Sequence, residues 1–398
     1  MTATLGVAFA PESEAEIADA VASARREKLA LDVVSGDTRR GLGRPSEGDA
    51  RLSTAKLSGI VFYEPAEMTI RARAGTPLAA IDRALAEKGQ MLPFEPMDHR
   101  ALYGTEGEPT VGGLVAANAS GPRRISAGAA RDSLIGVKLV NGRGETISVG
   151  GRVMKNVTGL DLTKLVCGAH GTLGVVTEAT FKLLPSPKAE ASIVIRRLDD
   201  LSAVAAMTRA LGSPYGVSGA AMLSPGMGRE WSRAFIRVEG FLDSVRDRAE
   251  KLIALLAEFG ARHALEGEDS RKLWRAIRDA TYLAAPRERA VWRVSVRPSD
   301  GATFVKSLGA AARDHFYDWG GGLVWLSTDP TIEAASTVRS ALARLSGHAT
   351  LVRAPAELRR SVDVFQPSSA ALARLTKGLK ASFDPDGIFN RGRMYAGL

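Results

Sequence analysis

The sequence predicts an α+β protein with two main domains, and two observations carry this prediction. In the first half, helical and extended segments alternate, and the strands end in turns rich in Gly, Ser, Asp and Thr. In the second half, from Ala189 onward, a strand–helix–strand–strand–helix order is typical of an antiparallel sheet with helices on one face. Pro185, Ser186 and Pro187 lie between the halves and mark a domain boundary.

The first half opens with a predicted helix over residues 11–28. Pro and acidic residues begin this segment, Ile17 and Val21 give it an apolar stripe, and basic residues end it. A short strand over 29–34 follows and breaks at the turn 35–38.

Further strands and one more helix follow in the first half. Asn141-Gly142 lies between two apolar runs and is a strong signal for a tight hairpin turn. The predicted elements are strands over 68–74, 134–140, 146–149 and 175–179 and a helix over 78–88.

The chain is basic and rich in arginine. Its 53 Lys and Arg residues exceed its 44 Asp and Glu residues by nine, and 40 of the 53 are Arg. The arginines are scattered and aromatic residues make up only 6%, which argues against nucleic-acid binding. An acidic protein partner and an anionic cofactor are two explanations of the surplus charge.

Cysteine content and hydropathy limit the classes further. Cys167 is the single cysteine, which excludes an internal disulfide and a cysteine zinc site. No apolar run reaches the roughly 18 residues that a membrane span needs. The N-terminus lacks the basic start and apolar stretch of a signal peptide. We therefore expect a cytoplasmic chain that does not itself insert into a membrane.

Common catalytic and nucleotide-binding motifs are missing from the sequence. It has no GxGxxG, no GxxxxGK[ST] and no GxSxG. No histidine lies within ten residues of another, so we expect no metal site. His170, in a Gly-rich loop, either lies near a cofactor or is held by backbone groups. Cys167 is read as a small buried hydrophobe in preference to a covalent flavin link.

Three loops rich in small residues follow one another in the first half. Residues 35–40 come directly after a strand, and consecutive backbone N–H groups in such a turn can bind an anion, although an ordinary turn is the alternative. Residues 110–124 combine Gly112-Gly113 with two alanines and leave room for a flat ring, or form a flexible turn. Residues 171–174 precede the last strand.

With these loops in this order, the chain resembles flavoproteins of the vanillyl-alcohol oxidase / p-cresol methylhydroxylase (PCMH) type. Among them it is similar to the FAD-binding subunits E of bacterial glycolate oxidases. The resemblance is strongest over 105–187 and 380–395. The segments that carry it are SGDTRRGLGR, TVGGLVAANASGPRR, SAGAARDSLIGVKLVNGRGE, RVMKNVTGLDLTKLVCGAHGTLGVVTEATFKLLP and FDPDGIFNRGRMY.

The resemblance implies a domain plan. A PCMH-type FAD-binding domain spans 1–187 and consists of two α/β subdomains, about 1–56 and 57–187. An α+β cap domain with an antiparallel sheet spans 188–345, and a C-terminal segment over 346–398 returns to the FAD domain. FAD would lie extended and non-covalently bound between these parts.

The resemblance also implies which residues hold FAD. The first loop would surround the pyrophosphate through backbone N–H groups, the second would follow the ribityl chain and ring, and the third the adenine side. The cofactor-binding residues implied in this way are Ser35, Gly36, Asp37, Thr38, Arg39, Gly112, Gly113, Ala117, Ser120, Gly121, Gly174, Val175, Val176 and Asn390.

Two features depart from the family pattern. Asp37 stands where the first loop commonly has Gly, and its charge is unfavourable beside a pyrophosphate unless the carboxylate turns away or pairs with Arg39 or Arg40. The histidine cluster with which related 2-hydroxy-acid enzymes bind a metal and handle substrate has no counterpart here. No catalytic residue is therefore assigned.

The resemblance implies an FAD-binding subunit of a glycolate oxidase complex, which oxidises glycolate to glyoxylate. Without the histidine cluster, we expect an accessory or electron-relay flavin subunit. Its expected partners are a homologous catalytic flavin subunit and an iron–sulfur subunit, and the complex would associate peripherally with the inner membrane. Two alternatives stay open: a self-sufficient FAD-dependent 2-hydroxy-acid dehydrogenase, and a structural subunit without flavin.

Overall fold

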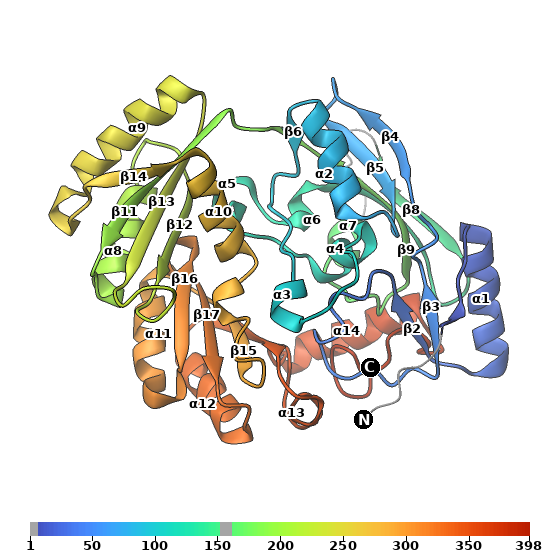
Figure 1. Ribbon diagram of the computed structural model, residues 1–398. Coiled ribbons are helices and arrows are strands. Elements are labelled where there is room, and N and C mark those ends of the chain that lie inside the picture. Colours follow the sequence, from blue (N-terminus) through green and yellow to red (C-terminus); the bar gives the residue numbers. More distant parts are fainter. Residues whose placement is uncertain (1–6, 152–160) are drawn as a thin grey trace.

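The computed structural model describes residues 7–151 and 161–398. The stretch RVMKNVTGL, part of one segment that carries the resemblance, lies outside the described residues. The described strands form sheets of three, five, eight and two strands, with helices packed against them (Figure 1). The predicted α+β class is confirmed.

The first sheet is small and parallel. Its strands β1 (Val7–Phe9), β3 (Ala50–Ser53) and β2 (Leu31–Val34) lie side by side in that order. Helix α1 (Glu14–Glu27) begins at Ser13, whose hydroxyl accepts a hydrogen bond from the Glu16 N–H. Its apolar stripe is buried against this sheet, which confirms the predicted first helix.

The second sheet is antiparallel and has the order β4-β5-β9-β7-β8. The predicted hairpin is confirmed: the Asn141 side-chain oxygen accepts the backbone N–H groups of Arg143 and Glu145 and closes the turn. The strands are β4 (Ile60–Glu64), β5 (Thr69–Arg73), β7 (Leu134–Val140), β8 (Thr146–Gly150) and β9 (Val175–Lys182).

Helices cover one side of the second sheet (Figure 1). The largest, α2 (Leu78–Glu87), buries Leu78, Ile81 and Leu85 at helical spacing. A two-stranded sheet of β6 (Gln90–Met91) and β10 (Leu184–Pro185) lies at the edge. The short helices are α3 (Arg100–Tyr103), α4 (Val111–Ala117), α5 (Arg124–Ala127), α6 (Ala130–Ser133) and α7 (Leu162–Val166).

The largest sheet, with its helices, forms a region that we call the cap (residues 189–353). Its order is β14-β11-β13-β12-β16-β17-β15-β18, and each strand runs antiparallel to its neighbours. Its strands are β11 (Ala189–Arg196), β12 (Val217–Leu223), β13 (Arg233–Gly240), β14 (His263–Glu266), β15 (Ala290–Val296), β16 (Asp314–Asp318), β17 (Leu323–Thr328) and β18 (Gly347–Arg353).

The two faces of the cap sheet have different neighbours. One face packs on helices and shares a core with them, as the sequence predicts. The other face carries Phe235 and Trp325 and joins the core of the first half. The main cap helices are α8 (Asp200–Leu211), α9 (Leu242–Leu255), α10 (Gly267–Arg278), α11 (Gly301–Leu308) and α12 (Ile332–Ala343), and the one-turn helices are η1 (Ala257–Phe259), η2 (Thr281–Leu283), η3 (Pro298–Asp300), η4 (Gly309–Ala311) and η5 (Trp319–Gly321).

The chain then returns to the first half through α13 (Ala356–Ser361) and α14 (Ala370–Phe383). The Leu31 N–H donates to the Ile388 carbonyl at 2.6 Å, and the fully buried Phe389 enters the core around the first sheet. Strand β18 belongs to the cap sheet although it follows residue 345, where the cap was predicted to end. The domain boundaries themselves stay a prediction.

A buried group of four charged residues joins the cap to the first half; we call it the seam quartet. Arg237 of β13 donates to both carboxylate oxygens of Glu95, at 2.8 and 3.0 Å. Arg123 donates to both oxygens of Glu239, at 2.7 and 3.1 Å. Burial alone would raise the pKa of Glu95, but Arg237 and Arg123 outweigh it and lower this pKa to about 2. Each cation therefore has a carboxylate partner.

Within residues 7–151 and 161–398, no helix is long and apolar enough to cross a membrane.

Candidate flavin site

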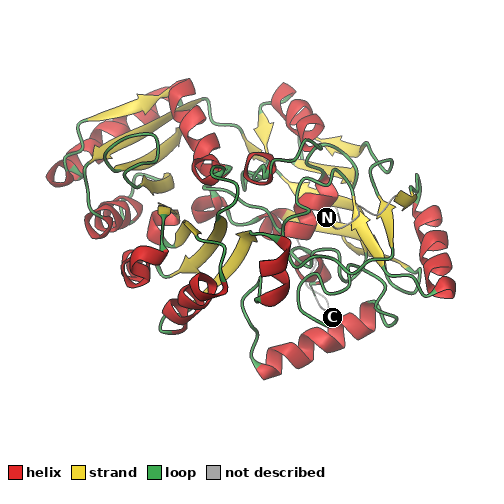
Figure 2. Cartoon of the chain, turned by 60° about the horizontal axis from the view of Figure 1, so that its bottom comes forward, coloured by secondary structure: helices red, strands yellow, loops and turns green. Residues whose placement is uncertain are grey.

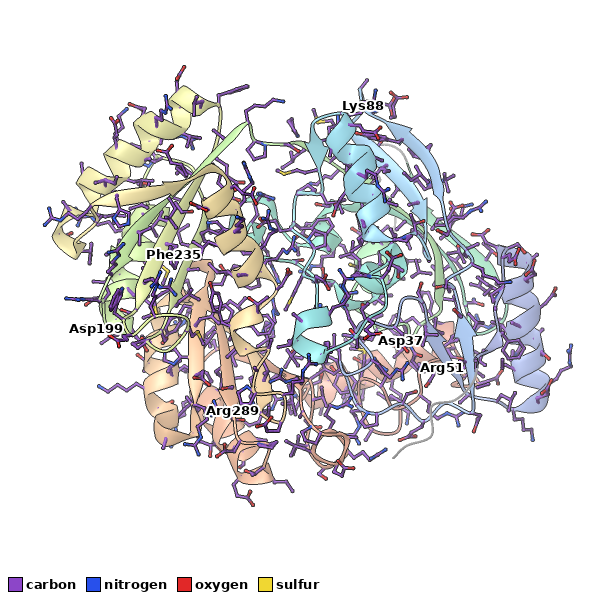
Figure 3. All side chains as sticks on the ribbon, in the orientation of Figure 1. Asp37, Arg51, Lys88, Asp199, Phe235 and Arg289 are labelled. Carbon is purple, nitrogen blue, oxygen red and sulfur yellow. The ribbon has the colours of Figure 1, made fainter. Side chains whose placement is uncertain are left out.

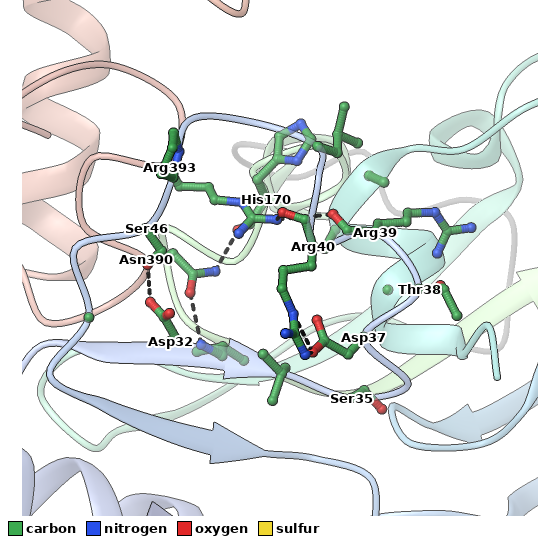
Figure 4. A pocket seen from close by; sticks show the side chains of 18 of the residues that line it. Asp32, Ser35, Asp37, Thr38, Arg39, Arg40, Ser46, His170, Asn390 and Arg393 are labelled. Atoms are coloured by element: carbon green, nitrogen blue, oxygen red, sulfur yellow. Dashed lines mark hydrogen bonds and ion pairs between the residues drawn. The ribbon is translucent and has the colours of Figure 1, made fainter. Parts of the chain in front are cut away.

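A cavity of about 440 Å³ lies where the first sheet meets α4 and the C-terminal segment (Figure 4). Its wall comes from the loop after β2, from α4, from the loop at His170, from α13 and from the segment that contains Asn390 and Arg393. Of the residues predicted to bind FAD, eight line it: Ser35, Gly36, Asp37, Thr38, Arg39, Gly113, Ala117 and Asn390.

The loop after β2 offers unused donors to this cavity. The backbone N–H groups of Gly36, Asp37, Thr38 and Arg39 donate no hydrogen bond to another described residue. The hydroxyl of Ser35 is buried and has no hydrogen-bond partner among the described residues. Gly36 is required for packing, because a Cβ there would lie 1.6 Å from the Glu108 carbonyl oxygen. Consecutive free N–H groups of this kind can bind an anion.

Asp37 is paired with arginines, so its negative charge is compensated beside the loop that would hold the pyrophosphate. Its carboxylate accepts Arg40 and lies 3.1 Å from Arg51 on β3 (Figures 3 and 4). Its φ of 53° is in the left-handed region, which Asp tolerates better than most residues. The pairing with Arg40 was one of the outcomes that the sequence allowed, whereas the second partner, Arg51, was not predicted.

Arg39 turns inward, away from the open side of the loop. Its Nε donates to the Nδ1 of His99 at 3.0 Å and its Nη2 to the Met97 carbonyl at 2.9 Å. Burial lowers the pKa of Arg39 to about 10 and holds the pKa of His99 well below its usual value. The remaining Nη1 lies over Gly113, 3.2 Å from where a Cβ would stand. Arg39 is thus a buried cation whose described partners are neutral.

The first part of the stretch 110–124 is a helix, which the sequence did not predict. The Thr110 hydroxyl accepts the Gly113 N–H and begins α4, and Val111, Leu114 and Val115 bury one side of it. Gly113 and Ala117 lie on the cavity side. Gly112 instead packs on Ala74, where a Cβ would come within 2.9 Å of the Ala74 Cβ.

The second part of the same stretch contacts the cap. The Gly121 carbonyl accepts the indole N–H of Trp319 at 3.2 Å, and the Arg124 guanidinium lies 4.7 Å from the ring centre of Trp319. The hydroxyl of Ser120 accepts the Ala130 N–H at 2.9 Å. Ser120 and Gly121 are absent from the wall of this cavity, so their contact with a flavin stays a prediction.

The third predicted segment lies at the start of β9. A Cβ on Gly174 would lie 2.7 Å from the Val140 carbonyl, so this glycine allows two strands to approach. Val175 is fully buried with Val140 in the core around the first sheet, and Val176 is buried in the larger core. These three residues do not line the cavity either, and their adenine contact stays a prediction.

Asn390 joins three segments at the cavity wall. Its side-chain oxygen accepts the Val33 N–H at 2.8 Å, and its amide donates to the His170 carbonyl at 2.7 Å. His170 packs its ring 4.8 Å from that of Phe365, and burial lowers its pKa to about 3. His170 therefore lies at the cavity, and its carbonyl and ring also contact neighbouring residues. The two interpretations from the sequence, a place near a cofactor and a histidine held by other protein groups, are compatible.

Sequence reasoning missed the arginines that the C-terminal part brings to the cavity. Arg359 donates to the Gly43 carbonyl at 2.8 Å, and Arg393 donates to the Arg39 carbonyl at 3.1 Å. Burial lowers the pKa of both. A hint was present in Arg359-Arg360 and FNRGRMY, but no spacing rule places these residues beside a loop more than 300 positions earlier.

Arg39, Arg359 and Arg393, which we call the cavity trio, share one property. Their described hydrogen-bond acceptors are carbonyl groups and an imidazole, none of them a carboxylate. Burying a cation without an anion costs free energy. With the free N–H groups of the first loop and the small residues of α4, this surplus charge fits a ligand with phosphates and a flat ring. FAD has both features.

Comparison with known proteins agrees with this chemistry. Residues 6–150 match the model of an FAD binding domain family. The chain is 36% identical over 374 residues to glycolate oxidase subunit GlcE of Escherichia coli (strain K12), and the match covers 94% of both chains. The chain belongs to the GlcE family of FAD-linked flavoproteins.

Two further likenesses of the GlcE-family chain concern another glycolate oxidase subunit and the fold. It is 33% identical over 150 residues to glycolate oxidase subunit GlcD of Bacillus subtilis (strain 168), covering 38% of this chain and 30% of that one. A crystal structure of p-cresol methylhydroxylase with substrate bound matches with a TM-score of 0.72 at 14% identity, over 96% of this chain and 87% of that one. The fold is therefore of the PCMH type, as predicted.

Cys167 does not line the cavity. It is buried at the end of α7, with its sulfur 3.7 Å from the side-chain oxygen of Asn118, and burial raises its thiol pKa to about 12. Such a thiol is a poor nucleophile, which agrees with the interpretation of Cys167 as a small buried hydrophobic residue.

Proposed function

We propose that this chain is the FAD-binding subunit of a glycolate oxidase complex that converts glycolate to glyoxylate. We further propose that it acts as an accessory or electron-relay flavin subunit, beside a homologous catalytic flavin subunit and an iron–sulfur subunit. The observation that carries FAD binding is the cavity trio, in which the buried Arg39 and the half-buried Arg359 and Arg393 have no carboxylate partner among the described residues. The likeness to GlcE over nearly the whole chain supports the complex.

The residues at the cavity have distinct tasks in this proposal. The free N–H groups of Gly36 to Arg39 and the Ser35 hydroxyl would hold the pyrophosphate, with the cavity trio supplying positive charge. Gly113 and Ala117 would admit the flat part of the cofactor, because their side chains are short. Bound FAD would supply a two-electron acceptor that can release electrons singly, which suits a relay.

The positions of the cap histidines support the accessory role. His315 lies 3.0 Å from Asp200, His263 lies 3.3 Å from Arg196, and His348 is exposed on β18. Among the described residues, no group of three or more His, Cys, Asp or Glu side chains is arranged to hold a metal ion. The metal-assisted handling of a 2-hydroxy acid that the resemblance implies for catalytic relatives therefore has no counterpart in the part of the chain that is described.

The test separates holding a flavin from turning over substrate. The purified chain is reconstituted with FAD, and glycolate or D-lactate is added without oxygen while flavin absorbance is followed. We expect stoichiometric flavin and no bleaching until the catalytic flavin subunit is added. Rapid bleaching of the chain alone would replace this proposal by a self-sufficient dehydrogenase. A colourless protein that cannot be reconstituted would replace it by a structural subunit.

The expected location follows from the complex. We propose that the chain itself stays in the cytoplasm and that any contact with the inner membrane is peripheral and made through the complex. Fractionation of cells with and without the partner subunits tests this point.

A further inference from the structure

Helix α14 (Ala370–Phe383) carries an apolar side with no partner among the described residues. Leu372 is 53% exposed and Leu375 is 65% exposed. On a helix, these two residues lie in the same rows as Leu379 and Phe383, which are both partly covered. The apolar side is therefore partly covered by the protein at the C-terminal end of the helix and is exposed to solvent at the N-terminal end.

Among the described residues, the contacts that hold the helix to the rest of the protein lie at its C-terminal end. The buried ammonium group of Lys380 donates to the carbonyls of Thr172 and Phe389, at 2.8 and 3.0 Å, and the Phe383 carbonyl accepts the Gly142 N–H at 2.8 Å. In contrast, every residue from Ala370 to Leu375 is exposed. Figure 2, which brings the bottom of the molecule forward, shows the helix along the outer edge.

A helix with an exposed apolar side is stabilised when another surface covers that side. Isolated helices of this length are marginal in water, and most helices in proteins are stabilised by packing an apolar side. Here packing is confined to the last turns, whereas the leucine side of the first turns faces solvent. A partner that covers Leu372 and Leu375 would complete the packing.

The charges of α14 define the chemistry of that partner. Arg374 and Lys377 are exposed beside the apolar rows, and no acidic residue lies between Ala370 and Phe383. A complementary surface is apolar at its centre and edged by carboxylates. The exposed large apolar residues of α14 are limited to Leu372 and Leu375, whereas a helix that lies on a membrane presents a continuous apolar face, so a protein surface suits this helix better.

We propose that residues 370–379 of α14 form a docking site for an acidic protein surface on another flavin subunit of the complex. This inference rests on the proposed function, because it takes its partner from the glycolate oxidase complex. The segment after α14 leads to Asn390 at the cavity wall, so the docking site and the candidate flavin site share one continuous segment.

The test uses the FAD-loaded full chain and the purified homologous flavin subunit from the same organism. Affinity is measured by biolayer interferometry for the wild type and for Leu372→Glu/Leu375→Glu. We expect the double variant to bind at least about 100-fold more weakly, because it places two charges in a buried apolar contact. Arg374→Glu/Lys377→Glu should weaken binding by about tenfold, and more at low salt. The matched control is Leu201→Glu, a leucine that is 61% exposed on α8 of the cap.

Each outcome decides the inference. Flavin content and circular dichroism of the variants show that they are folded. If Leu372→Glu/Leu375→Glu binds the partner as the wild type does, the docking site is elsewhere while the proposed function stands. If the wild-type chain does not bind the flavin subunit but binds the iron–sulfur subunit, the inference fails while the proposed function stands; if it binds neither subunit, both fail. Two other results would also overturn the inference. One is that the chain alone floats with phosphatidylglycerol vesicles and that the leucine substitutions abolish this flotation. The other is that the chain self-associates in light scattering and that the same substitutions abolish the self-association.

Discussion

Two sets of buried or half-buried arginines lie in this protein, and they differ in the groups that accept their hydrogen bonds. In the seam quartet, Arg123 and Arg237 each donate two hydrogen bonds to a carboxylate, and Arg237 is only 1% exposed. In the cavity trio, the acceptors that the structure shows are neutral groups. Burial lowers the pKa of the trio, whereas in the quartet Glu95 and Glu239 outweigh burial and raise the pKa of Arg237.

The difference separates a structural network from a binding site. A balanced buried network satisfies its own charges, so removing one member leaves an uncompensated charge. An unbalanced network is stabilised when an anion enters, so removing one of its cations weakens ligand binding more than folding. Three substitutions test this division, beginning with the largest expected effect.

Arg237→Met should destabilise the chain by about 3–5 kcal/mol, because it leaves Glu95 and Glu239 buried with one cation between them. Urea unfolding of the FAD-free chain measures this loss. The control Arg237→Met/Glu95→Gln removes both partners and should recover part of the loss. A loss below about 1 kcal/mol would mean that the quartet does not act as a balanced unit.

Arg359→Gln should weaken FAD binding by about tenfold or more, since it removes one charge-assisted contact of roughly 1.5–3 kcal/mol. The unfolding free energy without FAD should change by less than about 1 kcal/mol, because the glutamine amide nitrogen stands where the Arg359 Nε does and can still donate to the Ala354 carbonyl. Titration of FAD by fluorescence gives the dissociation constant, with the exposed Arg344→Gln as control. A large loss of stability with unchanged affinity for FAD would show that Arg359 stabilises the fold and does not bind the ligand.

Asp37→Asn should have the smallest effect and the opposite sign. Asn tolerates the left-handed backbone at this position, and without the carboxylate Arg40 and Arg51 are free to face an anion. We expect FAD to bind about threefold more tightly in the same titration. Weaker binding would show instead that the Asp37 carboxylate positions these two arginines.

The local elements were largely predictable from the sequence. Helix α1, the hairpin of β7 and β8 and the helix-covered antiparallel cap sheet follow from apolar spacing and turn residues, which act over a few positions. The stretch 110–124 was harder. Its small residues predict room for a flat ring or a flexible turn. In the structure, Val111, Leu114 and Val115 bury one side of a helix in its first part, and Arg123 and Arg124 join its second part to the cap.

The sequence by itself therefore determined the α+β class, the order of the elements, the loop that offers N–H groups to an anion and the family resemblance. Only the tertiary structure decided which charges face one another. Arg51 reaches Asp37, Arg359 and Arg393 reach the loop after β2, and Arg123 pairs with Glu239 of the cap. The physical reason is that backbone preference and turn chemistry act between near neighbours in the chain, whereas charge balance depends on distance in space.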